Sequence, residues 1–441
     1  MKYFGTDGIR GPYEGSFLNE NFAHSLGKAL GAHLQATGKS GQKVLLGRDT
    51  RPSGEILLNA FSQGLRVQGF HSLDAGILPT PALSSGVIHG NLGMGAMVTA
   101  SHNPSQDNGF KFFSGKGDKL SSHEEKLIES QIDLSGNFER SHAALPLHDA
   151  LDEYAERISG FFPDAFLRGY KIVADLANGA TIGTTARVLS HFGAEVHSLH
   201  EGEGVINDNA GSEHPRLMQD KVRETKAHFG LAHDGDGDRV VFADEKGNAI
   251  HGDQILGLLA LDAESSSSLK GEGLVATEHS NSGLEESLAN YGLKLFRSSV
   301  GDRNVAALMR EKGCNLGGES SGHVVASDYL PTGDGLYTAL LVAHAMVRNS
   351  KSLQELARSI ILWPSKVSAV TVKEKIPLAE KPALVKSVEE AKLQLGQNGR
   401  ILLRYSGTEP KIRLLVEGKQ EDLVAEIFDL LSEIIEKHCN S

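Results

Sequence analysis

The chain has 441 residues, of which 39% are hydrophobic and 23% are charged, an ordinary composition for a globular protein of three or four domains. Its formal net charge of -12 argues against a general nucleic-acid or anionic-membrane surface, although local clusters of Arg and Lys can still bind an anionic small molecule. With only Cys314 and Cys439, no signal peptide and no apolar run near the ~20 residues that span a bilayer, we expect a soluble, cytoplasmic protein without disulfides.

Short apolar runs that alternate with amphipathic segments predict three α/β units in chain order. Each unit begins with a strand that meets a polar loop, followed by a helix and a Gly-led return strand. The predicted strand–helix pairs are 44–46 with 53–67, 172–174 with 184–192, and 274–276 with 284–290. We interpret them as repeats because they recur in the same order, although a large α/β protein also contains several such units by chance.

The pattern changes after Trp363-Pro364. It predicts strands at 366–372, 400–404 and 412–417 and helices at 382–394 and 421–438, which together form an α+β tail domain. The polar stretch 133–149 reads as a linker. The predicted domains are 1–145, 146–250, 251–364 and 365–441.

Ser101 ends an apolar strand pattern and precedes His102-Asn103-Pro104. Pro104 restricts the residue before it, so the loop should be stiff and should project its side chains. A hydroxyl at the end of a strand can serve as a nucleophile or carry a phosphoryl group. The alternative is an ordinary turn in which Ser and Asn satisfy backbone groups. No Gly-x-Ser-x-Gly elbow surrounds Ser101, which argues against an α/β-hydrolase.

Three carboxylates, Asp234, Asp236 and Asp238, alternate with glycines. Carboxylates so close repel one another unless a cation neutralises them, and hard oxygen ligands favour Mg²⁺ or Ca²⁺ over Zn²⁺. A calcium loop is the rival interpretation, because Glu245 falls at its twelfth position. Arg239, however, occupies the sixth position, where that loop needs Gly, and a strand pattern follows. The sequence therefore favours Mg²⁺; a solvated acidic turn is the remaining alternative.

A glycine-rich turn at 317–323 contains Glu319, Ser321 and His323. The first two residues could hold sugar hydroxyls, and His323 could donate or accept a proton. Taken alone, a histidine in such a turn is more often structural.

A further polar loop lies at 404–413 in the tail. Its hydroxyls, its glycine and its two arginines suit a phosphate, although a hairpin turn is the simpler interpretation: the candidate ligands are Arg404, Ser406, Gly407, Thr408 and Arg413. Near the N-terminus Arg10 lies between glycines. Lys111 lies in an aromatic run soon after Ser101, so we expect it to act beside the nucleophile.

Four motifs occur in order along the whole chain: Thr-Ala-Ser-His-Asn-Pro, Asp-Gly-Asp-Gly-Asp-Arg, Gly-Glu-x-Ser-Gly-His and Arg-x-Ser-Gly-Thr-Glu-Pro. This set resembles the α-D-phosphohexomutases, and the opening residues 2–11 are most similar to the phosphoglucosamine mutase branch. The resemblance implies three homologous α/β domains and a C-terminal α+β domain around a central cleft.

The resemblance also implies a reaction. A phosphoryl group would pass between Ser101 and glucosamine 6-phosphate, giving a bound glucosamine 1,6-bisphosphate, which also serves as activator, and then glucosamine 1-phosphate. One Mg²⁺ per chain would be held by Ser101, Asp234, Asp236 and Asp238. Other implied roles are proton transfer and catalysis for Lys111, His323 and Arg10, charge stabilisation for His102 and Arg239, sugar binding for Glu319 and Ser321, and phosphate binding for Arg404, Ser406, Gly407, Thr408 and Arg413.

Ser320 departs from the family pattern, since many phosphoglucosamine mutases carry Gln or Asn there, so the substrate is less well defined than the reaction. A phosphoglucomutase/phosphomannomutase is the alternative within the family. A non-catalytic metal-binding protein and a serine-dependent phosphatase are alternatives outside it. Related bacterial enzymes are often dimers, so a homodimer is one expectation, although the sequence leaves the oligomeric state open. We expect no nucleic-acid or membrane partner.

Overall fold

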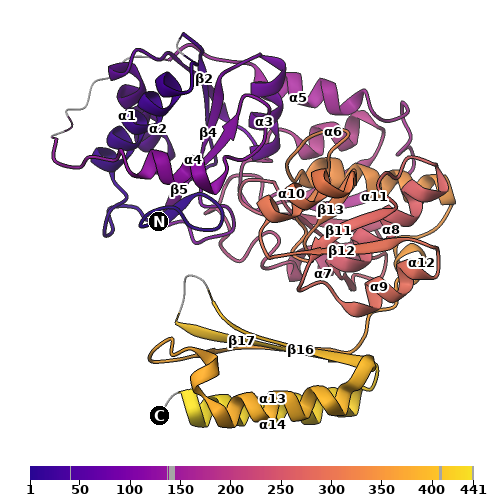
Figure 1. Ribbon diagram of the computed structural model, residues 1–441. Helices are drawn as coiled ribbons and strands as arrows, with labels where there is room; N and C mark the ends of the chain where they lie inside the picture. Colours follow the sequence, from indigo (N-terminus) through magenta and orange to yellow (C-terminus); the bar gives the residue numbers. More distant parts are fainter. Residues whose placement is uncertain (40, 137, 139–144, 407–409, 440–441) are drawn as a thin grey trace. The chain divides into compact units, whose positions relative to one another are not determined.

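The computed structural model describes residues 1–39, 41–136, 138, 145–406 and 410–439 (Figure 1). The chain forms two compact units. The first contains Met1–His279 and Leu293–Ser359, and the second contains Ser280–Gly292 and Ile360–Ser441. Each unit is described by itself.

The first sheet of the larger unit has the strand order β1-β5-β4-β2-β3. Its strands are β1 (Ile9–Pro12), β2 (Val44–Arg48), β3 (Ser72–Ile77), β4 (Met94–Val98) and β5 (Asp107–Ser114). Its helices are α1 (Glu20–Ala36), α2 (Gly54–Val67), α3 (Thr80–His89) and α4 (Ser122–Glu129). In Figure 1, α1 and α2 lie on one side of this sheet and α3 on the other. Helices α1 and α2 approach so closely that a Cβ on Gly64 would lie 2.0 Å from the His24 carbonyl oxygen, so this contact needs a glycine.

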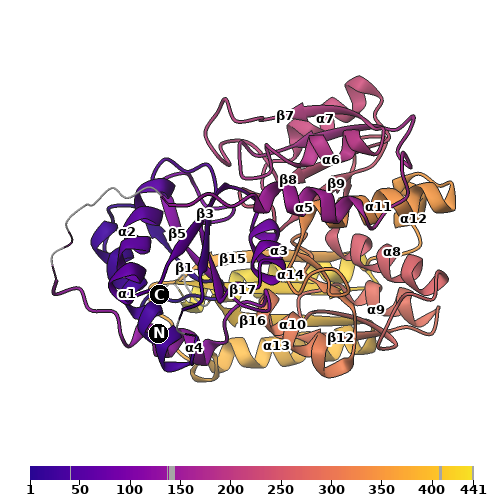
Figure 2. The same cartoon turned by 90° about the horizontal axis from the view of Figure 1, so that it is seen from above.

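The second sheet has the order β10-β9-β8-β6-β7. Its strands are β6 (Lys171–Asp175), β7 (Glu195–Leu199), β8 (Phe229–His233), β9 (Val240–Ala243) and β10 (Ala249–Ile250). Figure 2 shows α6 (Thr185–His191) and α7 (Arg216–Thr225) beside these strands, and α5 (Ala150–Ser159) precedes them in the chain.

The third sheet has the order β12-β11-β13-β14. Its strands are β11 (Gly273–Thr277), β12 (Lys294–Ser298), β13 (Leu316–Gly318) and β14 (Val324–Ala326). The neighbouring helices of this unit are α8 (Gly252–Ser265), α10 (Asp302–Lys312), α11 (Gly335–Asn349) and α12 (Leu353–Ala357).

The three sheets share one topology. In each, the first long parallel strand (β2, β6 or β11) lies between the second parallel strand and the third. A fourth strand (β5, β9 or β14) then pairs antiparallel with the third. The prediction of three similar α/β units is therefore confirmed. Ligands of such sheets gather beyond the carboxyl ends of the parallel strands.

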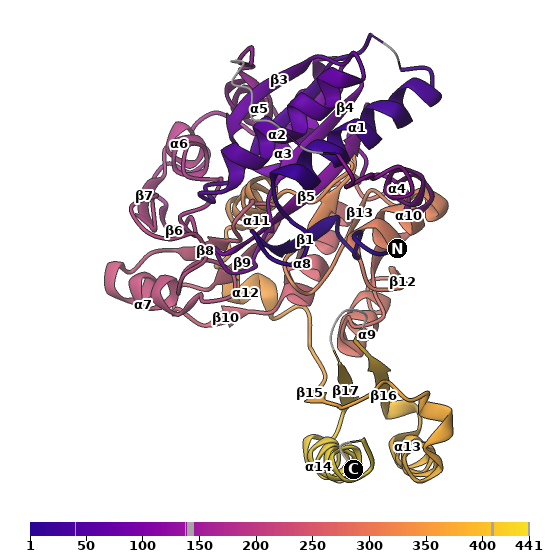
Figure 3. The same ribbon diagram turned by 90° about the vertical axis from the view of Figure 1, so that its left-hand side faces the viewer.

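The smaller unit is the predicted α+β tail. Its strands β15 (Ser365–Thr371), β16 (Gly399–Tyr405) and β17 (Lys411–Gly418) form an antiparallel sheet in the order β15-β17-β16. Helices α13 (Pro382–Leu395) and α14 (Glu421–Cys439) cover one face (Figure 3), where Ile412, Leu414 and Val416 are buried. Two single turns of 3₁₀-helix are η1 (Leu378–Glu380) and η2 (Gly396–Asn398).

Helix α9 (Ser282–Ala289) also belongs to the smaller unit. Asn281 fixes it there, because its amide donates to the Trp363 carbonyl at 3.0 Å and accepts from the Trp363 N–H at 2.8 Å. Among the described residues, we find no helix whose length and apolar character would let it cross a membrane.

Candidate active site

Three site loops occupy the same position in the three repeats, between the third parallel strand and the antiparallel strand that follows it. The serine loop (residues 99–104) joins β4 to β5, the acidic loop (residues 234–238) joins β8 to β9, and the glycine-rich loop (residues 319–323) joins β13 to β14. The repeat thus places three different polar sequences at equivalent points of three sheets.

Ser101 is buried and adopts a left-handed backbone conformation, with a φ of 54°. Its hydroxyl donates to Asp234 Oδ2 at 2.6 Å and lies 3.3 Å from His102 Nδ1. Burial, together with the nearby Arg239 and Arg10, lowers the pKa of His102 to about 4, so its ring is neutral at pH 7. The predicted nucleophile is therefore in direct contact with the predicted metal site.

The carboxylates of Asp234, Asp236 and Asp238 are all buried, and one oxygen of each lies within 4.8 Å of the others. Burial and the two other carboxylates raise the pKa of Asp234 well above its usual value. Burial would also raise the pKa of Asp238, but Lys111 holds it well below its usual range. Among the described residues, Asp236 Oδ1 and Asp238 Oδ1 are buried without a hydrogen-bond donor. Buried oxygens without a donor fit a hard divalent cation, and the strand β9 follows the loop directly, unlike the exiting helix of a calcium loop.

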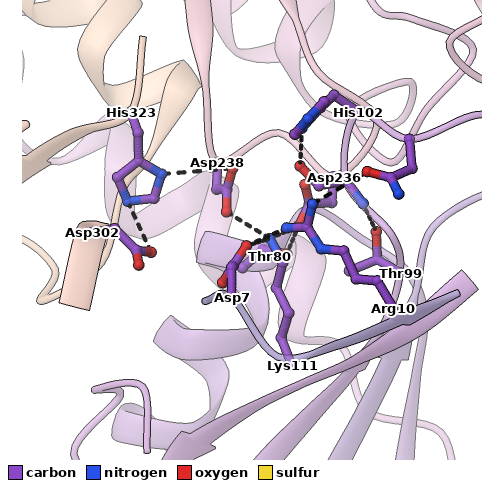
Figure 4. Close-up of polar contacts among 12 residues, drawn as sticks. Asp7, Arg10, Thr80, Thr99, His102, Lys111, Asp236, Asp238, Asp302 and His323 are labelled. Atoms are coloured by element: carbon purple, nitrogen blue, oxygen red, sulfur yellow. Dashed lines mark hydrogen bonds and ion pairs between the residues drawn. The ribbon is translucent and has the colours of Figure 1, made fainter. Parts of the chain in front are cut away.

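Lys111 is the main cation of the site (Figure 4). Its Nζ lies 2.7 Å from Asp236, 2.8 Å from Asp238 and 3.2 Å from Asp7. Burial alone would lower the pKa of Lys111, but Asp236 and Asp238 hold it well above its usual value. Asp236 also accepts from the Thr80 hydroxyl.

Arg10, in β1, lies close to the carboxylates around Lys111. Strand β1 pairs with β5, and this pairing sets Arg10 opposite Gly109. Its guanidinium donates to Asp7 and lies 3.4 Å from Asn103 Oδ1. A Cβ on Gly109 would lie 1.9 Å from the Ile9 carbonyl oxygen, so only glycine allows this pairing.

His323 is buried between two carboxylates, with Nδ1 3.7 Å from Asp238 and Nε2 3.5 Å from Asp302 (Figure 4). Burial would lower the pKa of His323, but Asp238 and Asp302 raise it above the usual value. Lys119 completes this part of the site by pairing with both Asp7 and Asp302.

Glu319 and Arg239 lie near these groups. Glu319 Oε1 accepts from the Gly301 N–H at 3.0 Å, and Ser321 is exposed in the same loop. The Arg239 backbone N–H donates to Asp234 at 3.2 Å. Burial would lower the pKa of its guanidinium, but Asp234 and Asp238 raise it.

The tail holds the remaining candidates as a separate group. Arg404 and Arg413 are direct cross-strand partners in β16 and β17, so two guanidinium groups project from one level of the sheet. Ser406 is buried; its N–H donates to the Lys411 carbonyl at 2.8 Å, and its carbonyl accepts from Lys375 Nζ at 2.8 Å. Gly407 and Thr408 lie outside the described residues.

Sequence reasoning missed four site residues: Asp7, Thr80, Lys119 and Asp302. Asp7 carried a signal, because it lies in the same N-terminal Gly-rich segment as Arg10. Asp302 looks like an ordinary acid in the first turn of a helix, and no local pattern marks Lys119 or Thr80.

Comparison with known proteins decides the family. Four family models match the chain: phosphoglucomutase/phosphomannomutase α/β/α domain I at residues 1–137, domain II at 152–247, domain III at 251–362, and the C-terminal domain at 368–434. The phosphoglucosamine mutase of Nitratiruptor sp. is 38% identical over 450 residues, covering 99% of each chain. That of Pseudoalteromonas atlantica is 42% identical over 423 residues, covering 95% of this chain and 94% of its own.

The chain belongs to the phosphoglucosamine mutase family. It is therefore an enzyme, an isomerase of the phosphohexomutase superfamily. A phosphoglucomutase/phosphomannomutase family protein from Burkholderia thailandensis superposes with a TM-score of 0.81 at 26% identity, covering 98% of this chain and 97% of that one. The N-acetylphosphoglucosamine mutase of Aspergillus fumigatus, solved with GlcNAc-6P and magnesium, shares the fold with a TM-score of 0.68 at 18% identity, covering 99% and 96%. Membership of the phosphoglucosamine mutase family excludes the non-catalytic metal-binding alternative.

Proposed function

We propose that the protein interconverts glucosamine 6-phosphate and glucosamine 1-phosphate through a phosphoserine at Ser101 and a bound glucosamine 1,6-bisphosphate. The observation that carries the proposal is the buried contact of 2.6 Å between the Ser101 hydroxyl and Asp234, inside a cluster of three carboxylates. Full-length similarity to proteins named phosphoglucosamine mutase supports the substrate.

In the first half-reaction the C1 hydroxyl of glucosamine 6-phosphate attacks the phosphorus on Ser101. The new O1–P bond forms while the Oγ–P bond breaks, the hydroxyl proton passes to a base, and Ser101 Oγ recovers a proton. In the second half-reaction Ser101 Oγ gives up that proton and attacks the phosphorus at C6, and O6 leaves with a proton. We assign these proton transfers to Lys111 and His323, each of which lies beside Asp238.

We assign one Mg²⁺ to Asp234, Asp236 and Asp238, with a phosphoserine oxygen as a further ligand. When bound, the ion neutralises charge on the transferring phosphoryl group. Arg10, His102 and Arg239 add positive charge or hydrogen-bond donors around Ser101, and this reduces the charge repulsion that the phosphoryl group meets.

The rest of the substrate needs its own contacts. We assign the sugar hydroxyls to Glu319 and Ser321, and the phosphate that is not transferred to Arg404, Ser406, Gly407, Thr408 and Arg413. The cross-strand arginine pair supports this assignment, because two guanidinium groups at one level of a sheet can both donate to one phosphate.

The test is a coupled assay of the Mg²⁺-loaded protein with glucosamine 6-phosphate and a trace of glucosamine 1,6-bisphosphate. We expect glucosamine 1-phosphate to form, Ser101→Ala to abolish the reaction, and Ser105→Ala, in the following turn, to keep it. Activity in Ser101→Ala at the wild-type rate would refute the phosphoserine mechanism. Release of inorganic phosphate in step with substrate loss would instead indicate a phosphatase.

A phosphoglucomutase/phosphomannomutase is the second candidate, because the structure of the Burkholderia protein of that family superposes over almost the whole chain. The residue that leaves the substrate open is Ser320. It is shorter than the Gln or Asn that many phosphoglucosamine mutases carry at this position. Comparing kcat/KM on glucosamine, glucose and mannose 6-phosphates separates the two. Cytoplasmic location and a homodimer stay predictions.

A further inference from the structure

The carbonyl oxygens of Ser101 and Asn103 are held by two side chains from different repeats. Arg51 Nη2, from the first repeat, lies 2.9 Å from the Ser101 oxygen and 2.8 Å from the Asn103 oxygen. Asn207 Nδ2, from the second repeat, lies 2.8 Å and 2.9 Å from the same two oxygens. Each nitrogen carries two hydrogens and each carbonyl has two lone pairs, so the four bonds saturate both donors and both acceptors.

Arg51 forms the fixed side of this arrangement. Its side chain is fully buried, and its Nε donates to Asp49 at 3.0 Å. Asp49 accepts from the Thr99 hydroxyl at 2.6 Å, and that hydroxyl accepts from the Ser101 N–H at 2.9 Å. The first repeat thereby fixes the Ser101 backbone at its nitrogen and at its oxygen.

Asn207 forms the side that comes from the second repeat. It lies in a loop of mostly exposed residues between β7 and α7, and its own N–H donates to the Ala177 carbonyl at 3.0 Å. Asn178 shapes that loop, because its Oδ1 accepts from the Gly202 and Gly204 N–H groups at 3.0 and 3.3 Å. The second repeat therefore presents one amide group to the backbone of the serine loop.

The chemistry at this position requires a donor. Asn207 faces two carbonyl oxygens, so only its NH₂ group gives attractive contacts, and an acceptor there would be repelled. The acidic loop approaches the same point: a Cβ on Gly235 would lie 2.6 Å from the Ser101 oxygen and 2.9 Å from Asn207 Nδ2. A shift of the Ser101 carbonyl would therefore also displace the loop that contains Asp234.

We infer that Asn207 is a positioning residue for phosphoryl transfer: its amide fixes the Ser101 backbone relative to the acidic loop, so that Oγ stays in line with phosphorus in both half-reactions. The left-handed backbone of Ser101 is a conformation that a serine does not hold without support. Displacement of a reacting atom by ~1 Å costs about 10²-fold in rate. The inference rests on the proposed phosphoserine chemistry.

The decisive pair of variants is Asn207→Asp and Asn207→Ala. Asp has the shape of Asn but cannot donate, so it sets a carboxylate against two carbonyl oxygens, whereas Ala leaves room for water. A donor role predicts that Asp is worse than Ala, with kcat reduced about 10-fold for Ala and about 100-fold for Asp at an almost unchanged KM. A role in filling space predicts the reverse order.

Asn209 is the matched control. It also has a left-handed backbone, with a φ of 51° against 60° for Asn207, but its side chain is exposed and donates to Asp208. Asn209→Asp and Asn209→Ala therefore make the same changes of charge and backbone preference away from Ser101. We expect both to keep kcat within about twofold of the wild-type value.

The readouts are kcat and KM with glucosamine 6-phosphate, thermal unfolding, and the rate at which Ser101 takes a phosphoryl group from a hexose 1,6-bisphosphate, followed by intact mass. Asn207→Asp with the kinetics of Asn209→Asp, or with a loss explained by KM or by unfolding, would overturn the inference and leave the proposed function intact. If Asp at 207 does not fold, Ala alone decides, because a kcat within twofold of wild type overturns the role. A wild-type protein whose Ser101 takes no phosphoryl group would instead refute the proposed function, and this inference with it.

Discussion

The serine loop and the acidic loop occupy equivalent positions in two repeats, yet they are held in different ways. In the serine loop, Arg51 and Asn207 bind main-chain carbonyls and leave the Ser101 side chain to its chemistry. In the acidic loop, Lys111 and Thr80 bind the carboxylates themselves.

The difference follows from what each loop has to do. A nucleophile that is alternately free and phosphorylated needs a backbone that stays fixed while its side chain changes. Carboxylates that surround a cation repel one another unless positive charge balances them, so their side chains themselves must be held. Equivalent places in a repeated fold can thus carry support through the backbone in one copy and through side chains in another.

The largest effect is expected from Lys111→Met. Loss of this ammonium leaves Asp7, Asp236 and Asp238 without their shared cation, and removing one partner of a buried ion pair costs roughly 3–5 kcal/mol. We expect the free energy of unfolding, measured in urea, to fall by this amount. We also expect kcat to fall about 10²- to 10⁴-fold. Lys116→Met, at an exposed position of the turn after β5, should change neither quantity. Wild-type stability in Lys111→Met would show that another group balances the acidic loop.

The next largest effect is expected from Mg²⁺ binding, which should depend more on the acidic loop than on Ser101. Binding of Mg²⁺ to the folded protein at 100 times its Kd should stabilise it by about 2.7 kcal/mol, which chelation removes. Ser101→Ala keeps the three carboxylates and loses only the phosphoserine ligand, so it should keep most of this gain, whereas Asp236→Asn should lose it. Tm measured against Mg²⁺ concentration tests both variants. An undiminished gain in Asp236→Asn would place the ion elsewhere, and a larger gain with Ca²⁺ than with Mg²⁺ would restore the calcium interpretation.

Gly235→Ala tests the contact between the two loops. The new Cβ would lie 2.6 Å from the Ser101 carbonyl oxygen, so one loop must move, at a cost of about 1–3 kcal/mol and with a fall in kcat. Gly136→Ala is the control, since its Cβ would meet no atom within 4 Å, and we expect a change within about 0.5 kcal/mol. Equal effects of the two substitutions on stability and kcat would mean that the loops are not coupled at this contact.

Much of the fold could be predicted because its signals are local. Short apolar runs that alternate with amphipathic segments identified β2, β6 and β11. Polar residues directly after β4, β8 and β13 identified the three site loops. The sequence also predicted a cation site in the acidic loop, because all three carboxylates lie within five residues of one another.

Contacts between distant segments could not be predicted. Arg10 and Lys111 come together because β1 pairs with β5, a pairing of segments about a hundred residues apart with no local signature. Asn207 looks like one more polar residue in an exposed loop, and α9 packs with the tail through Asn281 and Trp363, 82 residues apart. The roles of the site residues and the domain boundaries stay predictions.

The smallest expected effect concerns a buried carboxyl group outside both loops. Asp334 is held by the Tyr154 hydroxyl, 2.9 Å from each carboxyl oxygen, and by the Tyr337 N–H at 2.9 Å. Burial raises the pKa of Asp334 from 3.8 to about 7. Since the folded state holds this proton more tightly than the unfolded state, the group favours folding fully below pH 3.8, and its contribution is lost as pH rises toward and through 7.

Asp334→Asn removes this titration while keeping the shape of the side chain. Relative to that variant, the wild-type protein should lose about 1 kcal/mol of unfolding free energy between pH 6 and pH 8, measured by urea unfolding at each pH. Lys111 supplies to Asp238 the positive charge that holds the pKa of that buried carboxyl below its usual range, whereas Asp334 is held by a hydroxyl and a backbone amide. A difference between wild type and Asp334→Asn that does not change with pH would mean that Asp334 is already ionised at pH 6, as Asp238 beside Lys111 is expected to be.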